Sequence, residues 1–354
     1  MNSSPFPSPA RTRFTARVHR RGPGRAVRRP AAVAVLLALV LALTGLVAGA
    51  PQAAAATPCP TGLVTDESRF KDLKDWSYTP KYVRVDPCGY RMAYVDVGPR
   101  KGKVALLLHG NPTWGYYYRH SIQPLVDKGF RVIVPDLVGF GRSDKPNDRA
   151  ILTYDNYEKW VTDFIDELGL KDINLAVHDW GGLLGLRVVA FNQDKFSKVL
   201  ASDTSLPDGT GDFNVLFWLW QVAAQILPNF SLVIEVETAR ELSTEEEQAY
   251  DAPYTSYENS LAPRQLPLEV PGSAEDPDAV RNTQALAALR SFTKPFLTAY
   301  SDPDNITTGQ DDLFQATIPG AKGQPHADFK GAGHYILEDV SQDLTALTVK
   351  FFTS

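Results

Sequence analysis

The segment Ile173-Asn174-Leu175-Ala176-Val177-His178-Asp179-Trp180-Gly181-Gly182 decides the fold of this 354-residue chain. It begins with a short, mostly apolar run, which predicts a buried strand. Residues 182–192 continue as an apolar stretch that is compatible with a helix. The two glycines between these runs permit a sharp backbone turn. The segment therefore predicts a strand, a tight turn with Asp179 at its tip, and a helix.

The same alternation continues on both sides of this segment. From Tyr82 onward, short apolar runs alternate with amphipathic stretches, which predicts strands and helices wound into a mostly parallel sheet. The expected strands span residues 82–85, 91–95, 104–108, 131–135, 173–177, 198–201, 295–299 and 327–329, and the expected helices span residues 116–127, 154–168 and 182–192. This pattern belongs to the α/β class, with helices flanking a central sheet.

The alternation of predicted strands and helices stops between Asp203 and Ser291. This interval holds an aromatic segment, residues 213–227, and the sequence Ser243-Thr244-Glu245-Glu246, which is a capping box that opens a helix. We therefore expect residues 205–290 to form a helical cap, inserted into a core domain of residues 57–204 and 291–354. The Pro- and Asp-rich residues 263–278 predict an irregular surface loop.

The pattern of the N-terminal residues 1–56 predicts a signal peptide. Arginines precede an apolar run over residues 31–47, and a small-residue stretch ends at Ala56. The run is about seventeen residues long, at the short limit for a membrane span. We expect cleavage near Ala56, export to the periplasm, cell envelope or medium, and no stable membrane association afterwards. An uncleaved N-terminal anchor is the alternative.

The net charge of the chain indicates which binding partners to expect, and its cysteines indicate the redox conditions of its compartment. Residues 1–56 contain eight of the 36 basic residues and no acid, so 28 basic residues remain against 41 acidic ones, a formal charge of −13. Nucleic acid and anionic membranes are therefore not expected partners. The chain has two cysteines, Cys59 and Cys88, which we expect to pair in an exported protein, with two free thiols as the alternative.

Asp179 occupies the position at which a G-x-S-x-G elbow presents its serine nucleophile. An aspartate there predicts a different reaction, because carboxylate attack on a saturated carbon gives an ester that water can later cleave. The carboxylate needs no deprotonation, since its reference pKa is about 3.9. A helix N-cap is the alternative role for this residue.

Two further motifs favour catalysis. His109-Gly110-Asn111-Pro112-Thr113-Trp114 follows an apolar strand, where backbone N–H groups of such folds face the nucleophile. Gly331-Ala332-Gly333-His334 follows a late strand, at the place in the chain order expected for a general base. His109 and His178 are expected to be structural, because residues next to them in the sequence already take the expected catalytic and substrate-binding roles.

These motifs together resemble the haloalkane dehalogenases of the α/β-hydrolase superfamily. The resemblance also covers residues 69–94, 138–146 and 250–254, and so nearly all of the chain after residue 56. It implies an α/β-hydrolase fold in which Asp179 displaces halide by in-line attack and Trp180 donates its indole N–H to the departing ion. Asn111 is the second halide-binding candidate, or a cap tryptophan, Trp220 or Trp218; simple cap packing is the alternative for these two.

The resemblance further implies that His334 activates the water that cleaves the ester. Backbone N–H groups of Asn111 and Trp180 would hold the oxyanion. Asp304, after the strand at 295–299, is the expected acid that orients His334, and Asp203, after the strand at 198–201, is the alternative.

The expected partners are a small apolar halogenated substrate, water and halide, with no cofactor and no metal, and we expect a monomer. An epoxide hydrolase is the nearest alternative, because it uses a similar elbow but needs proton donors such as Tyr250, Tyr254 or Tyr257. A secreted binding protein of the same fold is the non-enzymatic alternative.

Overall fold

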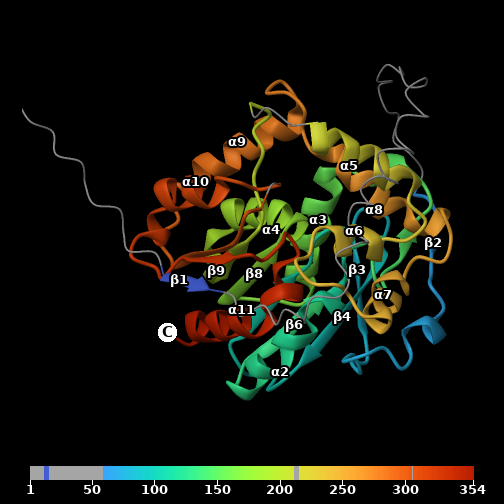
Figure 1. The fold of residues 1–354 in the computed structure, drawn as a ribbon, viewed down its shortest axis with the longest axis horizontal. Coiled ribbons are helices and arrows are strands. Elements are labelled where there is room, and N and C mark those ends of the chain that lie inside the picture. The colour runs from blue at the N-terminus through green and yellow to red at the C-terminus, as the bar shows by residue number, and fades with distance from the viewer. Residues whose placement is uncertain (1–11, 16–58, 211–214, 305) are drawn as a thin grey trace, which may run out of the picture.

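The protein is represented by a computed structural model that describes residues 12–15, 59–210, 215–304 and 306–354, with only the backbone described for residues 12–15 and 215–220. Its centre is a nine-stranded sheet in the order β1-β11-β10-β9-β8-β5-β6-β4-β3 (Figure 1). The β3–β4 and β4–β6 pairs are antiparallel and the other pairs are parallel. The strands are β1 (Thr12–Thr15), β3 (Lys81–Val85), β4 (Tyr90–Val97), β5 (Val104–Leu108), β6 (Arg131–Pro135), β8 (Ile173–His178), β9 (Phe196–Ser202), β10 (Phe296–Asp302) and β11 (Ala327–Lys330).

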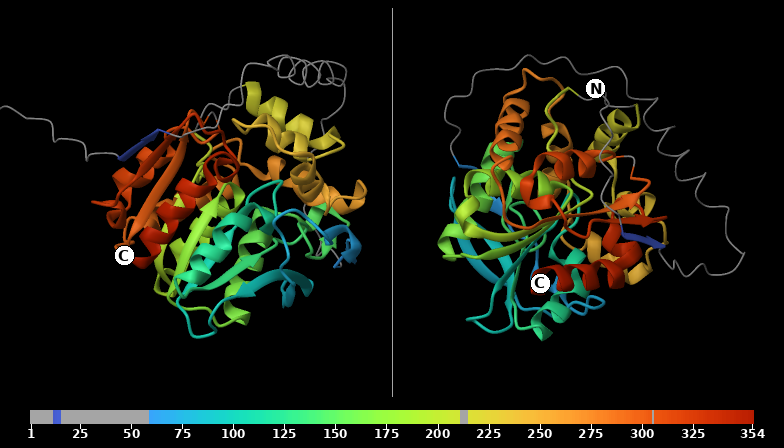
Figure 2. Two further views of the ribbon diagram at one scale, coloured as in Figure 1. Left: turned by 60° about the horizontal axis from the view of Figure 1, so that its bottom comes forward. Right: turned by 90° about the vertical axis from the view of Figure 1, so that its left-hand side faces the viewer.

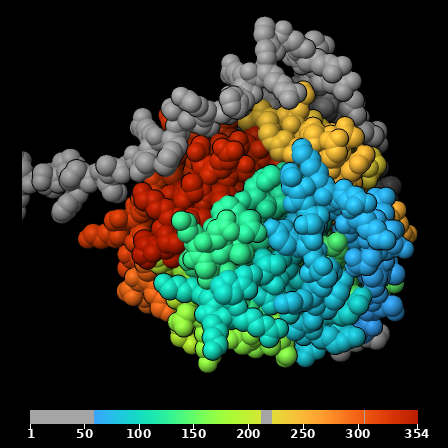
Figure 3. Space-filling view, turned by 90° about the horizontal axis from the view of Figure 1, so that it is seen from below, coloured from blue at the N-terminus to red at the C-terminus, as the bar shows by residue number. Residues whose placement is uncertain are grey.

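Helices cover both faces of this sheet (Figure 2). One group consists of α2 (Arg119–Asp127) and α11 (Ile336–Thr353), which contact each other. In the space-filling view from below, the red C-terminal segment accordingly lies against the teal to green segment (Figure 3). A second group consists of α3 (Tyr154–Glu167), α4 (Trp180–Phe191) and α9 (Pro277–Leu289), in which α4 contacts both others. The remaining flanking helix is α10 (Gln310–Thr317).

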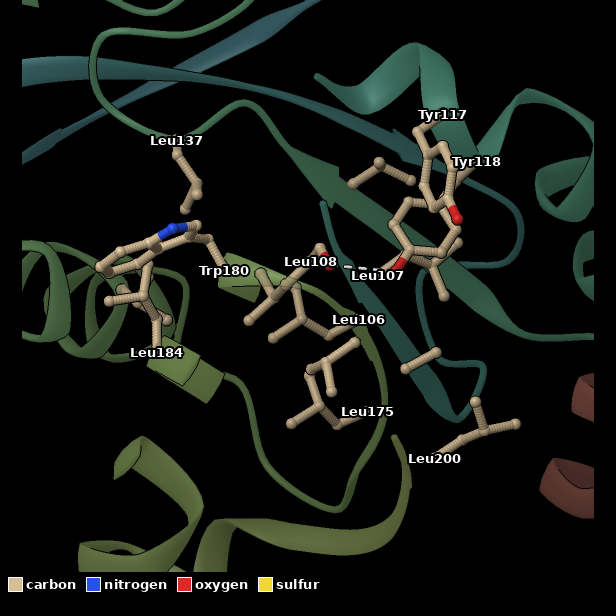
Figure 4. Close-up of a cluster of buried hydrophobic side chains, with 14 of the residues drawn as sticks. Leu106, Leu107, Leu108, Tyr117, Tyr118, Leu137, Leu175, Trp180, Leu184 and Leu200 are labelled. Atoms are coloured by element: carbon tan, nitrogen blue, oxygen red, sulfur yellow. Dashed lines mark hydrogen bonds between the residues drawn. The ribbon is translucent and has the colours of Figure 1, made fainter. Parts of the chain in front are cut away.

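The central strands are buried along their whole length. Every residue of β5 and of β8 is buried, as expected for parallel strands covered on both faces. Leucines of these strands pack with aromatic residues of neighbouring elements (Figure 4), and the Tyr118 hydroxyl donates a hydrogen bond of 2.9 Å to the Leu108 carbonyl. This packing fixes the carboxyl ends of β5 and β8, the two strands that carry the predicted oxyanion loop and Asp179.

The sequence predicted this architecture, and the eight expected strands are all present. The α/β-hydrolase fold class is thereby confirmed, with strand ends that differ by up to three residues. The strand β1 was not expected, because it falls within the predicted signal peptide, yet it pairs with β11 at the sheet edge. The disulfide between Cys59 and Cys88 is present, with an S–S distance of 2.10 Å.

Between β9 and β10, the described chain is helical. It forms α5 (Val215–Ile226), α6 (Ser231–Val236), α7 (Thr244–Asp251) and α8 (Leu261–Gln265) beside the sheet domain, together with the core-packed α9 (Figure 1). Ser243 caps α7 through the predicted capping box. The expected irregular loop at residues 263–278 is wrong at both ends, where helical turns form. The division into core and cap stays a prediction, and the contact of α9 with α4 favours a cap that ends before α9.

A buried ion network joins the helices α2, α7 and α11. The Arg119 guanidinium contacts both carboxylate oxygens of Glu338, at 2.6 and 2.8 Å, and each side chain is 1% exposed. Glu246 of α7 lies 3.4 Å from Arg119 and 2.8 Å from Arg240. Because an isolated charge is costly in a protein interior, each of these buried charged side chains is stabilised only together with its oppositely charged partners. In the part of the chain that the structure describes, no helix is both long and apolar enough to cross a membrane.

Candidate active site

The turn between β8 and α4 holds Asp179 in a strained conformation. Its φ of 49° and ψ of −126° lie outside the regions that non-glycine residues usually adopt. Neighbouring residues must be small for this turn to fit. A Cβ atom on Gly181 would lie 2.1 Å from the Leu108 carbonyl oxygen, and one on Gly110 would lie 2.4 Å from the Asp179 carboxylate. The predicted sharp turn with glycines around it is confirmed.

The Asp179 carboxylate is buried and accepts several hydrogen bonds. The backbone N–H of Asn111 donates to its Oδ1 at 2.6 Å, and the backbone N–H of Trp180 donates as well. Its Oδ2 lies 3.5 Å from Nε2 of His334. Burial disfavours the charged form, but His334 and these N–H groups outweigh it, so the pKa of Asp179 is lowered. A carboxylate in this state is a nucleophile that is ionised at neutral pH.

His334 lies between two carboxylates. Its Nδ1 is 3.3 Å from Oδ2 of Asp304, on the side of the ring opposite Asp179. Burial opposes a positive charge on the ring, but the charge of Asp304 and the hydrogen bonds to both acids prevail. The pKa of His334 is therefore raised well above 6.5. The structure thus brings together the three residues that the sequence singled out for catalysis.

The two candidate acids, Asp304 and Asp203, differ in their hydrogen bonds and in the direction of their pKa shifts. Asp304 accepts hydrogen bonds from the backbone of Ile306 and Thr307 and from the Thr307 hydroxyl, and these bonds and His334 lower its pKa despite burial. Asp203 is fully buried, and its Oδ1 accepts the Ser301 N–H at 2.8 Å, while its Oδ2 has no hydrogen-bond partner among the described residues. Burial and the nearby charge of Asp304 raise the pKa of Asp203 well above its usual value. The geometry favours Asp304 as the partner of His334.

The other two histidines of the motifs contact backbone groups. His178 forms a hydrogen bond of 2.8 Å with the His334 carbonyl oxygen, and His109 accepts the Leu137 N–H at 3.0 Å. Burial lowers the pKa of each imidazole to about 4, and the charge of His334 adds to this effect at His178. Both rings are therefore neutral, and His178 helps to hold the loop that carries His334.

These groups open onto a small pocket of about 60 Å³. The described residues that line it are Asn111, Asp179, Trp180, Leu183, Ser205, Pro207, Glu237, Val270, Ile306, Thr307, His334 and Tyr335. Neither the indole N–H of Trp180 nor the side-chain amide of Asn111 forms a hydrogen bond with another described residue. Two N–H donors thus lie at the pocket beside Asp179. Trp220 lies in α5, but its side chain, like that of Trp218, is outside the described part of the structure.

Sequence reasoning missed several of these lining residues. Tyr335 follows His334 directly, and its hydroxyl donates to the Asn111 carbonyl at 3.0 Å. Glu237 comes from the end of α6, almost a hundred residues before His334. No local pattern marks Glu237, because only the packing of the inserted helices brings it to the pocket. Among the described residues, no group of three or more His, Cys, Asp and Glu side chains is arranged to hold a metal ion.

Comparisons with known proteins show the family to which this chain is similar. The family model for the alpha/beta hydrolase fold matches residues 104–339. A haloalkane dehalogenase from Psychrobacter cryohalolentis is 42% identical over 294 residues, which cover 82% of this chain and 97% of the relative. A haloalkane dehalogenase from Mycolicibacterium paratuberculosis is 38% identical, over 80% of this chain and 95% of its own. The solved structure of a tetrameric haloalkane dehalogenase from Paraglaciecola agarilytica has a TM-score of 0.75 and 28% identity, covering 83% of this chain and 98% of that one.

Proposed function

The chain belongs to the haloalkane dehalogenases of the α/β-hydrolase fold family, hydrolases that act on carbon–halide bonds, and we propose that it works through a covalent ester on Asp179. One observation carries the proposal. The Asp179 carboxylate is ionised, held by two backbone N–H groups, and placed between a pocket and the imidazole of His334.

In the first step, an oxygen of Asp179 attacks the carbon that bears the halogen. A carbon–oxygen bond forms as the carbon–halogen bond breaks, and the electron pair leaves with the halide. The indole N–H of Trp180 and the side-chain amide of Asn111 would stabilise the developing anion without giving up a proton. The strained turn keeps the nucleophile fixed, so little reorganisation is needed at the moment of attack.

In the second step, His334 activates a water molecule. Formation of the ester removes the charge of Asp179, which is one of the two anions that raise the pKa of His334. The imidazole therefore loses its proton more easily in the intermediate and becomes a base when the water must be activated. Asp304 stabilises the imidazolium that forms as the water attacks the ester carbonyl.

The backbone N–H groups of Asn111 and Trp180 then hold the oxyanion, since they already donate to the carboxylate in the free enzyme. Collapse of this intermediate expels the alkoxide, which takes the proton from His334 and leaves as the alcohol, and the Asp179 carboxyl group then releases the second proton of the water and becomes a carboxylate again. Each turnover thus converts one haloalkane and one water into an alcohol, a halide ion and a proton.

The epoxide hydrolase alternative is not favoured, because the relatives above are haloalkane dehalogenases. The cap tyrosines that could protonate an epoxide oxygen are also occupied elsewhere. Tyr250 donates to Glu338, Tyr254 donates to the Pro112 carbonyl at 3.0 Å, and Tyr257 is exposed beside Arg149. None of the three is among the described residues that line the pocket.

Two measurements test the proposal. Wild-type protein should release bromide from short bromoalkanes and should not open a matched panel of epoxides. In the variant His334→Phe, the second step is blocked, so intact-mass spectrometry after addition of 1-bromobutane should show one butyl adduct. The double variant Asp179→Asn, His334→Phe is the control and should show none. Bromide release by His334→Phe with no adduct would contradict the covalent route.

A further inference from the structure

A carboxylate that the reaction above does not use lies at the active-site pocket. Glu237 lines this pocket together with Asp179 and His334. Its carboxylate forms no hydrogen bond or ion pair with any other residue in the described ranges. Burial raises the pKa of Glu237, and the nearby charges of His334 and Asp304 act on it in opposite directions. An unpaired acid in a largely buried setting is costly unless something else binds it.

The backbone of Glu237 is fixed to the loop that carries His334. Its carbonyl oxygen accepts the Tyr335 N–H at 3.4 Å, and it would lie 2.2 Å from a Cβ atom on Gly333. The Asp339 carboxylate accepts N–H groups from Gly333 and from Arg240 at 2.7 and 2.9 Å, and so ties both segments together. The backbone of Glu237 is therefore held against the loop that carries His334.

The other described residues that line the pocket form no hydrogen bond or ion pair with the Glu237 carboxylate. Apart from the reacting groups, several of its described lining residues are apolar, namely Leu183, Pro207, Val270 and Ile306. The only basic side chain among them is His334, which already lies between Asp179 and Asp304. A ligand that fills this pocket would thus meet a carboxyl group whose hydrogen-bonding capacity is free among the described residues, and an ammonium group beside it would favour its charged form.

We propose that Glu237 determines specificity by accepting a hydrogen bond from the substrate. The preferred substrates are short haloalkanes that carry a hydroxyl or ammonium group at the end away from the halogen, and haloalkanes with a carboxylate there are disfavoured. This inference rests on the proposed dehalogenase function. The attack of Asp179 on the carbon and the departure of the halide are unchanged, because Glu237 contacts only the far end of the substrate.

Three bromides of equal chain length provide the test: 1-bromobutane, 3-bromopropan-1-ol and 3-bromopropylammonium. They differ only in whether a methyl, hydroxyl or ammonium group ends the chain. Bromide release gives kcat/KM for the wild type, for Glu237→Gln and for Glu241→Gln, with enzyme-free blanks subtracted. Glu241 is an exposed acid four residues away, so its variant makes the same change of charge outside the pocket.

A hydrogen bond to a charged group is worth roughly 10- to 100-fold in binding. Glu237→Gln should therefore lower the ratio of kcat/KM for 3-bromopropylammonium to that for 1-bromobutane by about tenfold or more. The ratio for the alcohol should fall by a smaller factor, and Glu241→Gln should keep both wild-type ratios. Glu237→Asp retains the charge and should keep more of the ammonium preference than Glu237→Gln.

The outcomes distinguish the proposed role of Glu237 from the proposed dehalogenase function. Bromide release with ratios that do not change in Glu237→Gln would overturn the role of Glu237 and leave the dehalogenase function intact. The same fall in Glu241→Gln would also overturn it, since a general effect of charge would then explain the preference. Absence of bromide release from all three compounds by the wild type would overturn both the function and this inference.

Discussion

Replacing Asp304 by Asn should slow ester hydrolysis far more than it slows formation of the ester. Asp304 lies 3.3 Å from Nδ1 of His334, and both side chains are 3% exposed, so the pair is shielded from water. Removing one member of a buried charged pair costs roughly 3 to 5 kcal/mol, which corresponds to about 10²- to 10⁴-fold in rate if the transition state bears the loss. Asp203→Asn keeps the acceptor for the Ser301 N–H and should cost less than about tenfold.

Rapid-quench experiments with substrate in excess over enzyme separate the two steps. Asp304→Asn should show a burst of one halide per active site followed by slow release of alcohol. Its pH profile should also move. Asp304 raises the pKa of His334, and hydrolysis is lost as the pH falls through that pKa, so the acid limb should shift to lower pH in the variant. A greater loss in Asp203→Asn than in Asp304→Asn would refute the assignment.

Three further changes test the buried ion network, the nucleophile turn and the disulfide. Arg119→Met should lower the free energy of unfolding by up to about 3 kcal/mol, measured by urea denaturation, because the buried Glu338 carboxylate loses the guanidinium that contacts both of its oxygens and keeps Arg240 and the Tyr250 hydroxyl as partners. A second substitution that removes this carboxylate should restore most of the loss. Gly110→Ala should lower kcat/KM about 100-fold by displacing the nucleophile, whereas Gly272→Ala, which faces open space, should leave it unchanged. Replacing Cys59 and Cys88 by serine should lower the melting temperature, corresponding to a loss of up to about 3 kcal/mol, and equal stability of the two proteins would argue against a stabilising disulfide.

The sequence alone predicted the elements that depend on neighbouring residues. The apolar run of β8, the glycines after Asp179 and the capping box of α7 are local patterns, and each produces the structure that its chemistry requires. The catalytic candidates could be named for the same reason, because each lies directly after a strand. In a mostly parallel sheet the carboxyl ends of the strands meet at one edge, so their order along the chain already implies that they converge. Export and the monomeric state are predictions of the sequence that the fold does not address.

The sequence favoured Asp304 over Asp203 as the acid beside His334, but only the tertiary structure shows what each of the two carboxylates contacts. Asp203 and Asp304 both follow strands, but their carboxylates differ in their surroundings. Asp304 has His334 and hydroxyl and N–H donors around it, whereas one oxygen of Asp203 is buried with no hydrogen-bond partner in the described part of the chain. Glu237 has no sequence signature, because helices inserted between β9 and β10 bring it to the pocket. The physical reason is common to both cases. Burial and the charges of residues distant in the chain set the pKa and the partners of an acid, and these depend on how the whole chain packs.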